Sequence, residues 1–418
     1  MPTIVIAPYN VATFPEGGGH FWVYLQYVLG LRQLGCEVYW LEAFRSKGRA
    51  EREAAALATF RARMRQHGLD AKTILYVTHS KEPSPDAPTE YLDMDRDEAE
   101  AVFARADLLL NFHYGISPGL LAQFRRTALV DIDPGLLQFW VSREQVCVPR
   151  HDFYFTTGET VGAIGSKIPD CGLEWIHIRP PVCLERWPFE FDPSCKAFTT
   201  VSAWDASDWI VDDVENFENT KRVAFLEFAD LPRLTRQPLE LALFLRWERD
   251  LDEKEDLERR GWRIRHSREV AATPEAYQAY IQQSRGEFSC AKRSCIKFQN
   301  GWVSDRTLCY LASGKPVVVQ DTGPSSVLPN GQGVFRFTTA QQAAEAFKTI
   351  NADYERHCHA ARKLAETHFD AKQVVAKILS HALHKTEAAA TSTRLESPGA
   401  LAWALQRTSP ALRRHDAL

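Results

Sequence analysis

Residues 14–42 read FPEGGGHFWVYLQYVLGLRQLGCEVYWLE, and the order of residue types in this stretch predicts a loop, a helix and a strand. A short apolar run, TIVIAPY at residues 3–9, precedes it and predicts a first strand. Apolar residues then recur at helical spacing from about His20 to Leu34, and Gly35 is a typical helix stop signal. The following CEVYWLEAF, at residues 36–44, predicts a second strand. The stretch therefore indicates one βαβ unit with three glycines at the start of its helix.

The same alternation continues along the first half of the chain. Strands are predicted at residues 72–78, 106–113 and 125–133, with helices at 47–67, at 97–106 and from about 119. Such a βαβα order is typical of a parallel sheet with helices on both faces. Prolines then crowd residues 168–194, which predicts an extended linker.

A second alternating series begins at AFTTVSAW, residues 197–204. Helices are predicted over 238–261, 273–285, 304–314, 340–350 and 353–384, and strands over 262–267, 286–292, 316–321 and 333–337. We therefore expect two α/β, Rossmann-like, doubly wound domains that face a cleft, at residues 1–185 and 195–365. A helix at 366–384 and a mobile or loosely packed tail at 385–418 would follow.

Composition narrows the functional classes. The formal net charge of −4 gives no electrostatic reason to expect a nucleic-acid partner. No apolar run approaches the roughly 20 residues that span a bilayer, so we expect no transmembrane segment. The first ten residues lack the basic region of a secretion signal, and the odd number of cysteines, nine, favours free thiols in a reducing compartment. These features predict a cytoplasmic protein.

The glycine-rich loop does not fit a dinucleotide fingerprint. Gly17 and Gly19 occupy the first two places of Gly-x-Gly-x-x-Gly, but Trp22 occupies the third. A helix that begins near Gly18 and Gly19 would still present free N–H groups and a positive dipole end to an anion. The alternative is a simple loop-to-helix connection.

Both halves of the chain resemble the GT-B fold of glycosyltransferases. GGGHFWVYLQYVLGLRQLGCEVYWLE resembles the first loop and helix of that fold, and GWVSDRTLCYLASGKPVVVQDTG resembles its donor-binding helix and strand. The second motif, extended to residue 337, is also similar to a largely uncharacterised group of bacterial glycosyltransferases. The resemblance implies an acceptor-binding first domain, a second domain that binds a nucleotide sugar, and a final helix that crosses back. Retaining enzymes of this fold usually carry two glutamates where this sequence has Gly301 and Cys309.

The resemblance and the residue types together suggest a set of donor-binding groups. Ser304 or Asp305 is expected to cap a helix whose first turn faces a diphosphate, with Arg306 as a charged contact. Other groups follow predicted strands, where ligands of parallel sheets bind. The remaining donor-binding candidates are Gly18, Gly19, Arg268, Lys292, Lys297, Asp321, Thr322 and Gly323. For most of them a solvated loop residue or an ordinary turn is the alternative.

A reaction centre is predicted in the first domain. His20, directly after the glycines, is the candidate general base, because histidine titrates near neutral pH. Asp131 and Asp133, at the end of a strand, are the candidates for holding it in its tautomer. His113 and Trp22 are candidate sugar or acceptor contacts. Packing inside the protein is the alternative for each of them.

We therefore expect a metal-independent glycosyltransferase that uses a nucleoside-diphosphate sugar as co-substrate, with no other cofactor. Its partners would be that nucleotide sugar and an acceptor. Two alternatives remain open at this point, namely a sugar-nucleotide epimerase of the same fold and a non-catalytic sugar-nucleotide binding protein. The replacement of the family glutamate by Cys309 favours the last of these.

Overall fold

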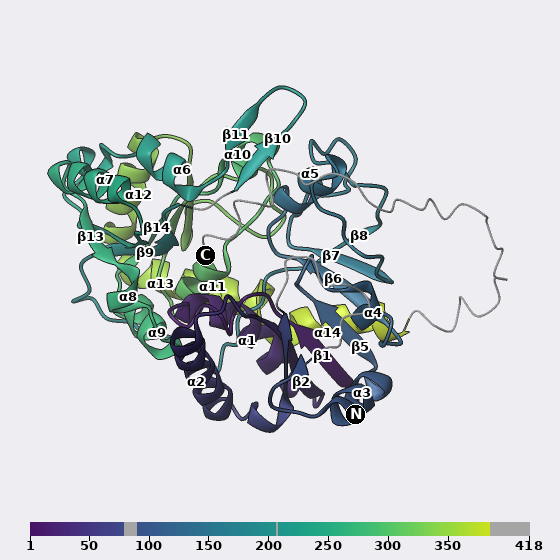
Figure 1. Ribbon diagram of the computed structural model, residues 1–418. Coiled ribbons are helices and arrows are strands. Elements are labelled where there is room, and N and C mark those ends of the chain that lie inside the picture. Colours follow the sequence, from purple (N-terminus) through teal and green to yellow (C-terminus); the bar gives the residue numbers. More distant parts are fainter. Residues whose placement is uncertain (79–89, 206–207, 385–418) are drawn as a thin grey trace.

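Two parallel sheets form the framework of the protein (Figure 1). The computed structural model describes residues 1–78, 90–205 and 208–384. The tail expected at 385–418 lies outside these residues. In the described part of the chain, no helix is long and apolar enough to cross a bilayer.

The first sheet has eight strands, parallel except at one edge. Its order is β4 (Glu90–Tyr91), β3 (Thr73–Thr78), β2 (Glu37–Arg45), β1 (Thr3–Ala7), β5 (Leu108–Asn111), β6 (Thr127–Asp131), β7 (Phe153–Thr156) and β8 (Trp175–His177). Its helices are α1 (Gly18–Gln33), α2 (Ala50–Gln66), α3 (Arg96–Arg105), α4 (Pro118–Leu121) and α5 (Leu136–Ser142). All five residues of β1 are buried, as expected for a central strand with both faces covered.

The second sheet has six parallel strands. Its order is β13 (Arg263–His266), β12 (Leu239–Phe244), β9 (Phe198–Ala203), β14 (Gly286–Ser289), β15 (Val317–Gln320) and β16 (Val334–Phe337). A separate hairpin consists of β10 (Trp209–Val211) and β11 (Asn216–Glu218). The helices that follow the linker are α6 (Lys221–Glu227), α7 (Glu248–Arg259), α8 (Ser267–Val270), α9 (Pro274–Gln282), α10 (Arg293–Phe298), α11 (Asp305–Ala312), α12 (Ala340–Ala352), α13 (Tyr354–His368) and α14 (Ala371–His384). The predicted two-domain α/β fold is confirmed.

The bounds of one predicted helix and the predicted linker are wrong in detail. The helix expected over 238–261 begins only at Glu248, because the apolar run LELALF before it is the buried strand β12. Such a run has no periodicity that distinguishes a strand from a buried helix. The linker expected over 168–194 contains the edge strand β8.

The helix expected over 353–384 is interrupted at Phe369 and Asp370. There the chain pairs with the linker, since the Val182 N–H donates to the Phe369 carbonyl at 2.8 Å and the Ala371 N–H donates to the Val182 carbonyl at 3.0 Å. After the break α14 crosses to the first domain and packs on α1 (Figure 1). A Cβ at Gly30 of α1 would lie 2.7 Å from the Ala371 carbonyl oxygen, so this contact is close.

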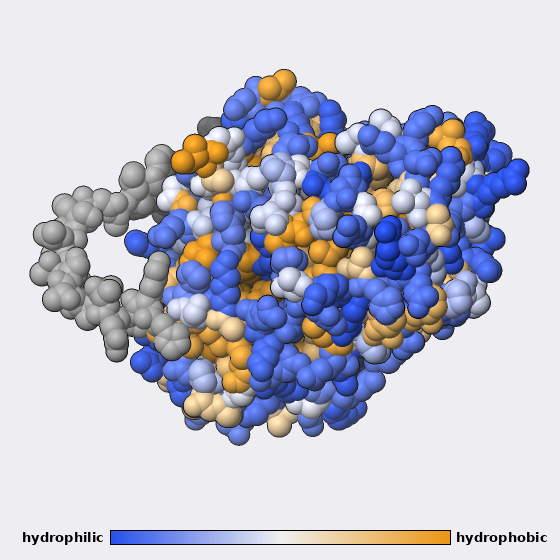
Figure 2. Space-filling view, turned by 180° about the vertical axis from the view of Figure 1, so that it is seen from behind, coloured by the Kyte–Doolittle hydropathy of each residue, from blue (hydrophilic) through white to orange (hydrophobic). Residues whose placement is uncertain are grey.

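The two domains are joined through one continuous apolar core. Buried side chains of α1, α9 and α11 belong to the same cluster as those of β1 and α14. Seen from the side opposite to Figure 1, hydrophilic side chains cover most of the surface, and apolar ones gather toward its middle (Figure 2). The shared apolar cluster holds the starts of α1 and α11 in one place.

Candidate functional site

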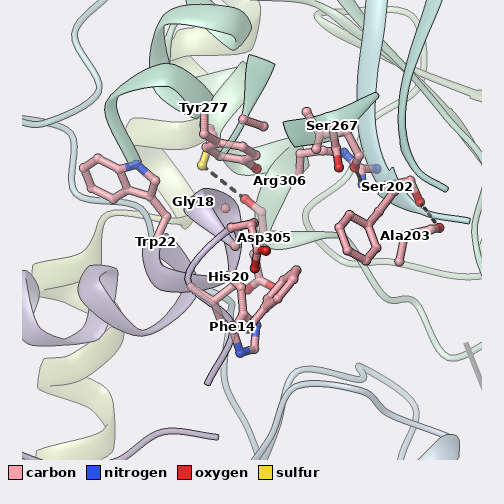
Figure 3. Close-up of a pocket in the computed structure, with 18 of the residues that line it drawn as sticks. Phe14, Gly18, His20, Trp22, Ser202, Ala203, Ser267, Tyr277, Asp305 and Arg306 are labelled. Atoms are coloured by element: carbon pink, nitrogen blue, oxygen red, sulfur yellow. Dashed lines mark hydrogen bonds between the residues drawn. The ribbon is translucent and has the colours of Figure 1, made fainter. Parts of the chain in front are cut away.

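The starts of α1 and α11 meet around a cavity of about 300 Å³ between the two domains (Figure 3). The predicted residues that line it are Gly18, Gly19, His20, Trp22, Ser304, Asp305 and Arg306. They come from helices that lie almost 300 positions apart in the sequence, and both helices point their N-termini at the same space. Free N–H groups and two positive dipole ends therefore converge there.

Two of the three glycines, Gly18 and Gly19, are explained by contact between the domains, whereas Gly17 packs against Phe14 of its own domain. None of them has a positive φ, so the backbone freedom expected of them is not used. A Cβ on Gly18 would lie 2.3 Å from the Thr273 carbonyl oxygen, and one on Gly19 would lie 2.6 Å from the Tyr277 ring. The Gly18 N–H also donates to the Ala271 carbonyl at 3.2 Å. Glycine is needed here because the second domain packs directly on the first turn of α1.

His20 is half-buried at the edge of the cavity, beside Phe14 (Figure 3). Its Nε2 donates to the Tyr9 carbonyl at 2.7 Å, since a carbonyl can only accept. Nδ1 then carries the lone pair, and no group in the described part of the chain hydrogen-bonds it. Burial lowers the pKa of His20, so the ring is neutral at neutral pH. A neutral imidazole with a free Nδ1 can accept a proton.

The two aspartates expected to hold His20 have other partners. Asp131 is fully buried and accepts hydrogen bonds from Gln138 at 2.7 Å and from the Thr156 hydroxyl at 2.9 Å. Burial raises the pKa of Asp131 to about 6. Asp133 forms an ion pair with Lys292 of the second domain at 2.6 Å. Within residues 1–78, 90–205 and 208–384, the Tyr9 carbonyl therefore fixes the His20 tautomer, and the expected aspartate–histidine contact does not form.

The first turn of α11 combines a free helix start with a buried ion pair. Ser304 is the N-cap, but its side chain makes no capping hydrogen bond. Burial raises the pKa of Asp305 to about 6. Arg306 is directed into its own domain, where it donates to Glu287 at 2.7 Å and to the Val201 carbonyl at 2.7 Å. Its charge is therefore largely neutralised by Glu287, although the side chain lines the cavity.

Two lysines lie close to this turn, and one of them was not predicted. Lys292 bridges Asp133 and Asp208, at 2.6 and 2.9 Å. Burial alone would lower the pKa of Lys292, but these two carboxylates raise it overall. Lys221, at the start of α6, lies over the Trp302 ring at 5.4 Å and pairs with no carboxylate among the described residues.

Burial, together with the cations Arg306 and Lys292, lowers the pKa of Lys221 to about 7. Lys221 is not part of the cavity wall. Its charge nevertheless acts on Asp305, which is a residue of that wall. The sequence offered one signal for Lys221, because the residue begins the first helix after the first strand of the second domain. Anions bind at helix starts in this position.

Several predicted donor-binding residues lie outside the cavity wall. Arg268 forms an ion pair with Glu16 of the first domain at 3.1 Å. Lys297 pairs with Asp212 at 2.5 Å and with Glu215 at 2.7 Å.

The loop after β15 is held by its own side chains. Asp321 accepts from the Gly323 N–H at 2.8 Å, and the Thr322 hydroxyl donates to the Trp302 carbonyl at 2.8 Å. The structure gives these three residues contacts that shape the loop.

The two candidate acceptor contacts differ in their surroundings. Trp22 is buried, and its indole N–H donates to the Pro274 carbonyl at 2.8 Å, which makes it a domain contact. His113 lies at the end of β5, where its ring stacks on that of Tyr9.

The sequence interpretation missed the strand ends of the second domain. Ser202 and Ala203 at the end of β9, and Phe244 and Arg246 at the end of β12, line the cavity. The signal was available, because ligands of parallel sheets bind beyond the carboxyl ends of the strands. The strand β12 was read as helix, and its end was therefore not considered.

Structural contacts explain the two residues that stand where retaining GT-B enzymes usually carry glutamates. Cys309 is buried in the cavity wall, and its thiol donates to the Asp305 carbonyl at 3.5 Å. Gly301 has φ +67°, and a Cβ there would lie 2.7 Å from the Pro324 carbonyl oxygen. Neither position can supply a carboxylate to a ligand.

No protein-family model matches the sequence, and no curated protein matches it. Solved structures do match. An α-glucosyltransferase in complex with UDP superposes with a TM-score of 0.58 at 11% identity, over 91% of this chain and 100% of that one. Anabaena HepE in complex with UDP and glucose has a TM-score of 0.55 at 12% identity, over 91% and 100%. TarM has a TM-score of 0.55 at 10% identity, over 91% and 98%.

The chain has the GT-B fold. The likeness covers both domains, and it therefore includes the relative arrangement of the domains. The cavity described above lies between the two domains of this GT-B fold, at the carboxyl ends of the strands of the second one.

Proposed function

We propose that the protein is a glycosyltransferase that moves a sugar from a nucleoside-diphosphate sugar to an acceptor bound mainly by the first domain. The observation that carries the proposal is the shared cavity, where the starts of α1 and α11 meet the ends of β9 and β12 between two GT-B domains. Solved structures of the same fold contain UDP, or UDP with glucose, which supports a nucleoside-diphosphate donor.

The diphosphate would be bound by the start of α11 and by nearby cations. Transfer of the sugar leaves negative charge on the departing diphosphate, and helix N-termini and lysines stabilise such charge. Lys221 is the strongest candidate, because its ammonium has no carboxylate partner in the described part of the chain. To bind the diphosphate, Lys292 would have to give up its ion pair with Asp133. These cations supply the charge that the reaction needs, so we propose that it is metal-independent.

His20 is the proposed general base where the reaction inverts the sugar configuration. Its neutral ring has Nε2 bound to the Tyr9 carbonyl, which leaves Nδ1 to take the proton of an acceptor hydroxyl. The Tyr9 carbonyl then stabilises the protonated ring through the same hydrogen bond. The aspartates proposed from the sequence are not needed to fix the tautomer.

We also propose that the protein acts in the cytoplasm. All nine cysteines are free thiols, which suits a reducing compartment.

A thermal-shift screen with UDP-, dTDP- and GDP-sugars tests donor binding. A ligand at a hundredfold excess over its Kd stabilises by about 2.7 kcal/mol, which is a clear rise in Tm. We expect the sugars of one of these nucleotides to raise the Tm in this way. No shift with any nucleotide would contradict the proposal.

Turnover separates the proposal from the alternatives. A transferase releases free nucleotide faster when an acceptor is present, an epimerase releases none, and a binding protein converts nothing. We expect His20→Ala to abolish most transfer and His359→Ala, in an exposed histidine of α13, to leave it unchanged. Equal activity of both variants would exclude His20 as the base.

A further inference from the structure

Two aromatic rings form a stacked pair beside the cavity, on the first domain. Tyr9 follows β1 and His113 follows β5, and these strands are neighbours in the sheet. Their ring centroids lie 5.0 Å apart with an interplanar angle of 29°. Tyr9 is 39% exposed, so part of this large aromatic residue is open to solvent. We call this pair the Tyr9–His113 platform.

Hydrogen bonds to the backbone fix both residues of the platform in place. The Tyr9 carbonyl accepts from His20 Nε2 at 2.7 Å, which links the platform to the wall of the cavity. The Asn111 side chain accepts from the His113 N–H at 2.8 Å and donates to the His113 carbonyl at 3.0 Å. A binding surface that is already ordered loses little entropy when a ligand binds.

The His113 ring of the platform is uncharged near neutral pH. Burial lowers the pKa of His113 to about 4. The imidazole therefore serves as a neutral aromatic ring under the exposed Tyr9, and it is not poised to act as a base at neutral pH.

Polar residues lie at the same carboxyl edge of the sheet as the platform. His20 donates to the backbone carbonyl of Tyr9, and Tyr114 follows His113 in the chain. Asp133 follows β6, the strand that pairs with β5. One flat aromatic face with hydroxyl, imidazole and carboxylate residues at the same edge of the sheet suits a ring that has an apolar C–H face and hydroxyls at its edge. A flat apolar molecule would need apolar walls instead.

From this geometry we infer that the Tyr9–His113 platform binds the pyranose ring of a carbohydrate acceptor, with an acceptor hydroxyl directed at His20. The inference rests on the proposed glycosyltransferase function and names its acceptor class. It assigns to Tyr9 a binding role and to His113 the support of the Tyr9 ring.

Saturation-transfer NMR on the whole protein with UDP present tests this inference. The probes are methyl hexopyranosides of glucose, galactose and N-acetylglucosamine, compared with p-nitrophenol as a flat apolar probe. We expect saturation of the axial C–H protons on one sugar face. Tyr9→Ala should weaken binding of the best glycoside about tenfold, whereas Tyr9→Phe should keep it within about twofold because the ring remains.

A matched control is available in Phe191, which is 38% exposed and packs on Tyr354 in the second domain. Phe191→Ala removes an equally exposed ring and should leave glycoside binding unchanged. Binding of p-nitrophenol but not of the glycosides, equal loss in Tyr9→Phe, or no glycoside binding would each overturn the inference. Binding of UDP in the same samples would then show that the proposed donor site still stands. If Tyr9→Ala does not fold, the saturation pattern of the unmodified protein and the Tyr9→Phe variant still decide.

Discussion

Gly18 is the position at which the first turn of α1 comes closest to the second domain. The atom that a Cβ would meet, at 2.3 Å, is the Thr273 carbonyl oxygen, which cannot rotate away as a side chain would. We expect Gly18→Ala to destabilise the protein by about 1–3 kcal/mol through overpacking. Urea unfolding measures this loss.

Gly119 is the matched control for that substitution. It lies in α4, and a Cβ there meets nothing within 4 Å. Gly119→Ala should leave stability unchanged or raise it by about 0.5–1 kcal/mol, since alanine is the better helix former. If the two variants were equally stable, the proposed reason for the glycines would be wrong.

We expect Lys221 to make nucleotide binding depend on pH. Its pKa is about 7 in the free protein, and a bound diphosphate would raise it, so that binding takes up a proton. The affinity for UDP should therefore fall as the pH rises above 7, by about fivefold between pH 7 and pH 8. Calorimetry in buffers of different ionisation enthalpy measures both the affinity and the proton uptake.

Lys221→Met should bind UDP more weakly and with little pH dependence over the same range. Lys348, on α12, is 68% exposed, and Lys348→Met serves as the control with unchanged affinity and slope. Unchanged proton uptake in Lys221→Met would show that another group titrates.

At the scale of elements, the contact between α1 and α9 includes a buried hydrogen bond. The Trp22 indole donates to the carbonyl of Pro274, the first residue of α9. Trp22→Phe keeps most of the ring and leaves that carbonyl without a donor, which should cost about 1–3 kcal/mol. Thermal or urea unfolding measures this cost.

Trp247 provides the comparison, because its side chain is 49% exposed. Trp247→Phe should change the stability by less than about 0.5 kcal/mol. An equally small effect at Trp22 would mean that α1 and α9 are held by apolar contact alone.

For the whole molecule, the relative position of the domains depends partly on an ion pair across the cleft. Asp133 and Lys292 lie on different domains, 2.6 Å apart and both partly exposed, so the pair contributes about 1 kcal/mol at most. Asp133→Asn should let the domains separate more often. Hydrogen exchange of the Gly18 amide, which is bonded to Ala271 of the other domain, should become up to about fivefold faster.

The control for this experiment is an ion pair that lies within the second domain. Asp256 lies in α7 and accepts a hydrogen bond at 2.7 Å from Arg260, the residue directly after that helix. Asp256→Asn should not change exchange at Gly18. If Asp133→Asn also left it unchanged, the ion pair would have no part in holding the domains together.

Local sequence patterns predicted most of the framework. A helix was predicted over 273–285, and in the structure the Thr273 hydroxyl caps its start by accepting from the Ala276 N–H at 3.1 Å. The helix after the glycines was placed within two residues of α1. These features depend on residues a few positions apart, so a short stretch contains the information. The strand β12 was missed because its apolar run fits a strand and a buried helix equally well.

The sequence by itself thus determined much of the alternation of strands and helices, the two-domain α/β fold class and the starts of α1 and α9, because those follow from neighbouring residues. Only the tertiary structure decided which partner each charged group has and why the glycines are there. Asp133 meets Lys292, 159 positions away, and Gly18 meets Thr273 from the other domain. Such contacts, and the burial that lowers the pKa of Lys221, depend on how distant elements pack, and no local pattern specifies that.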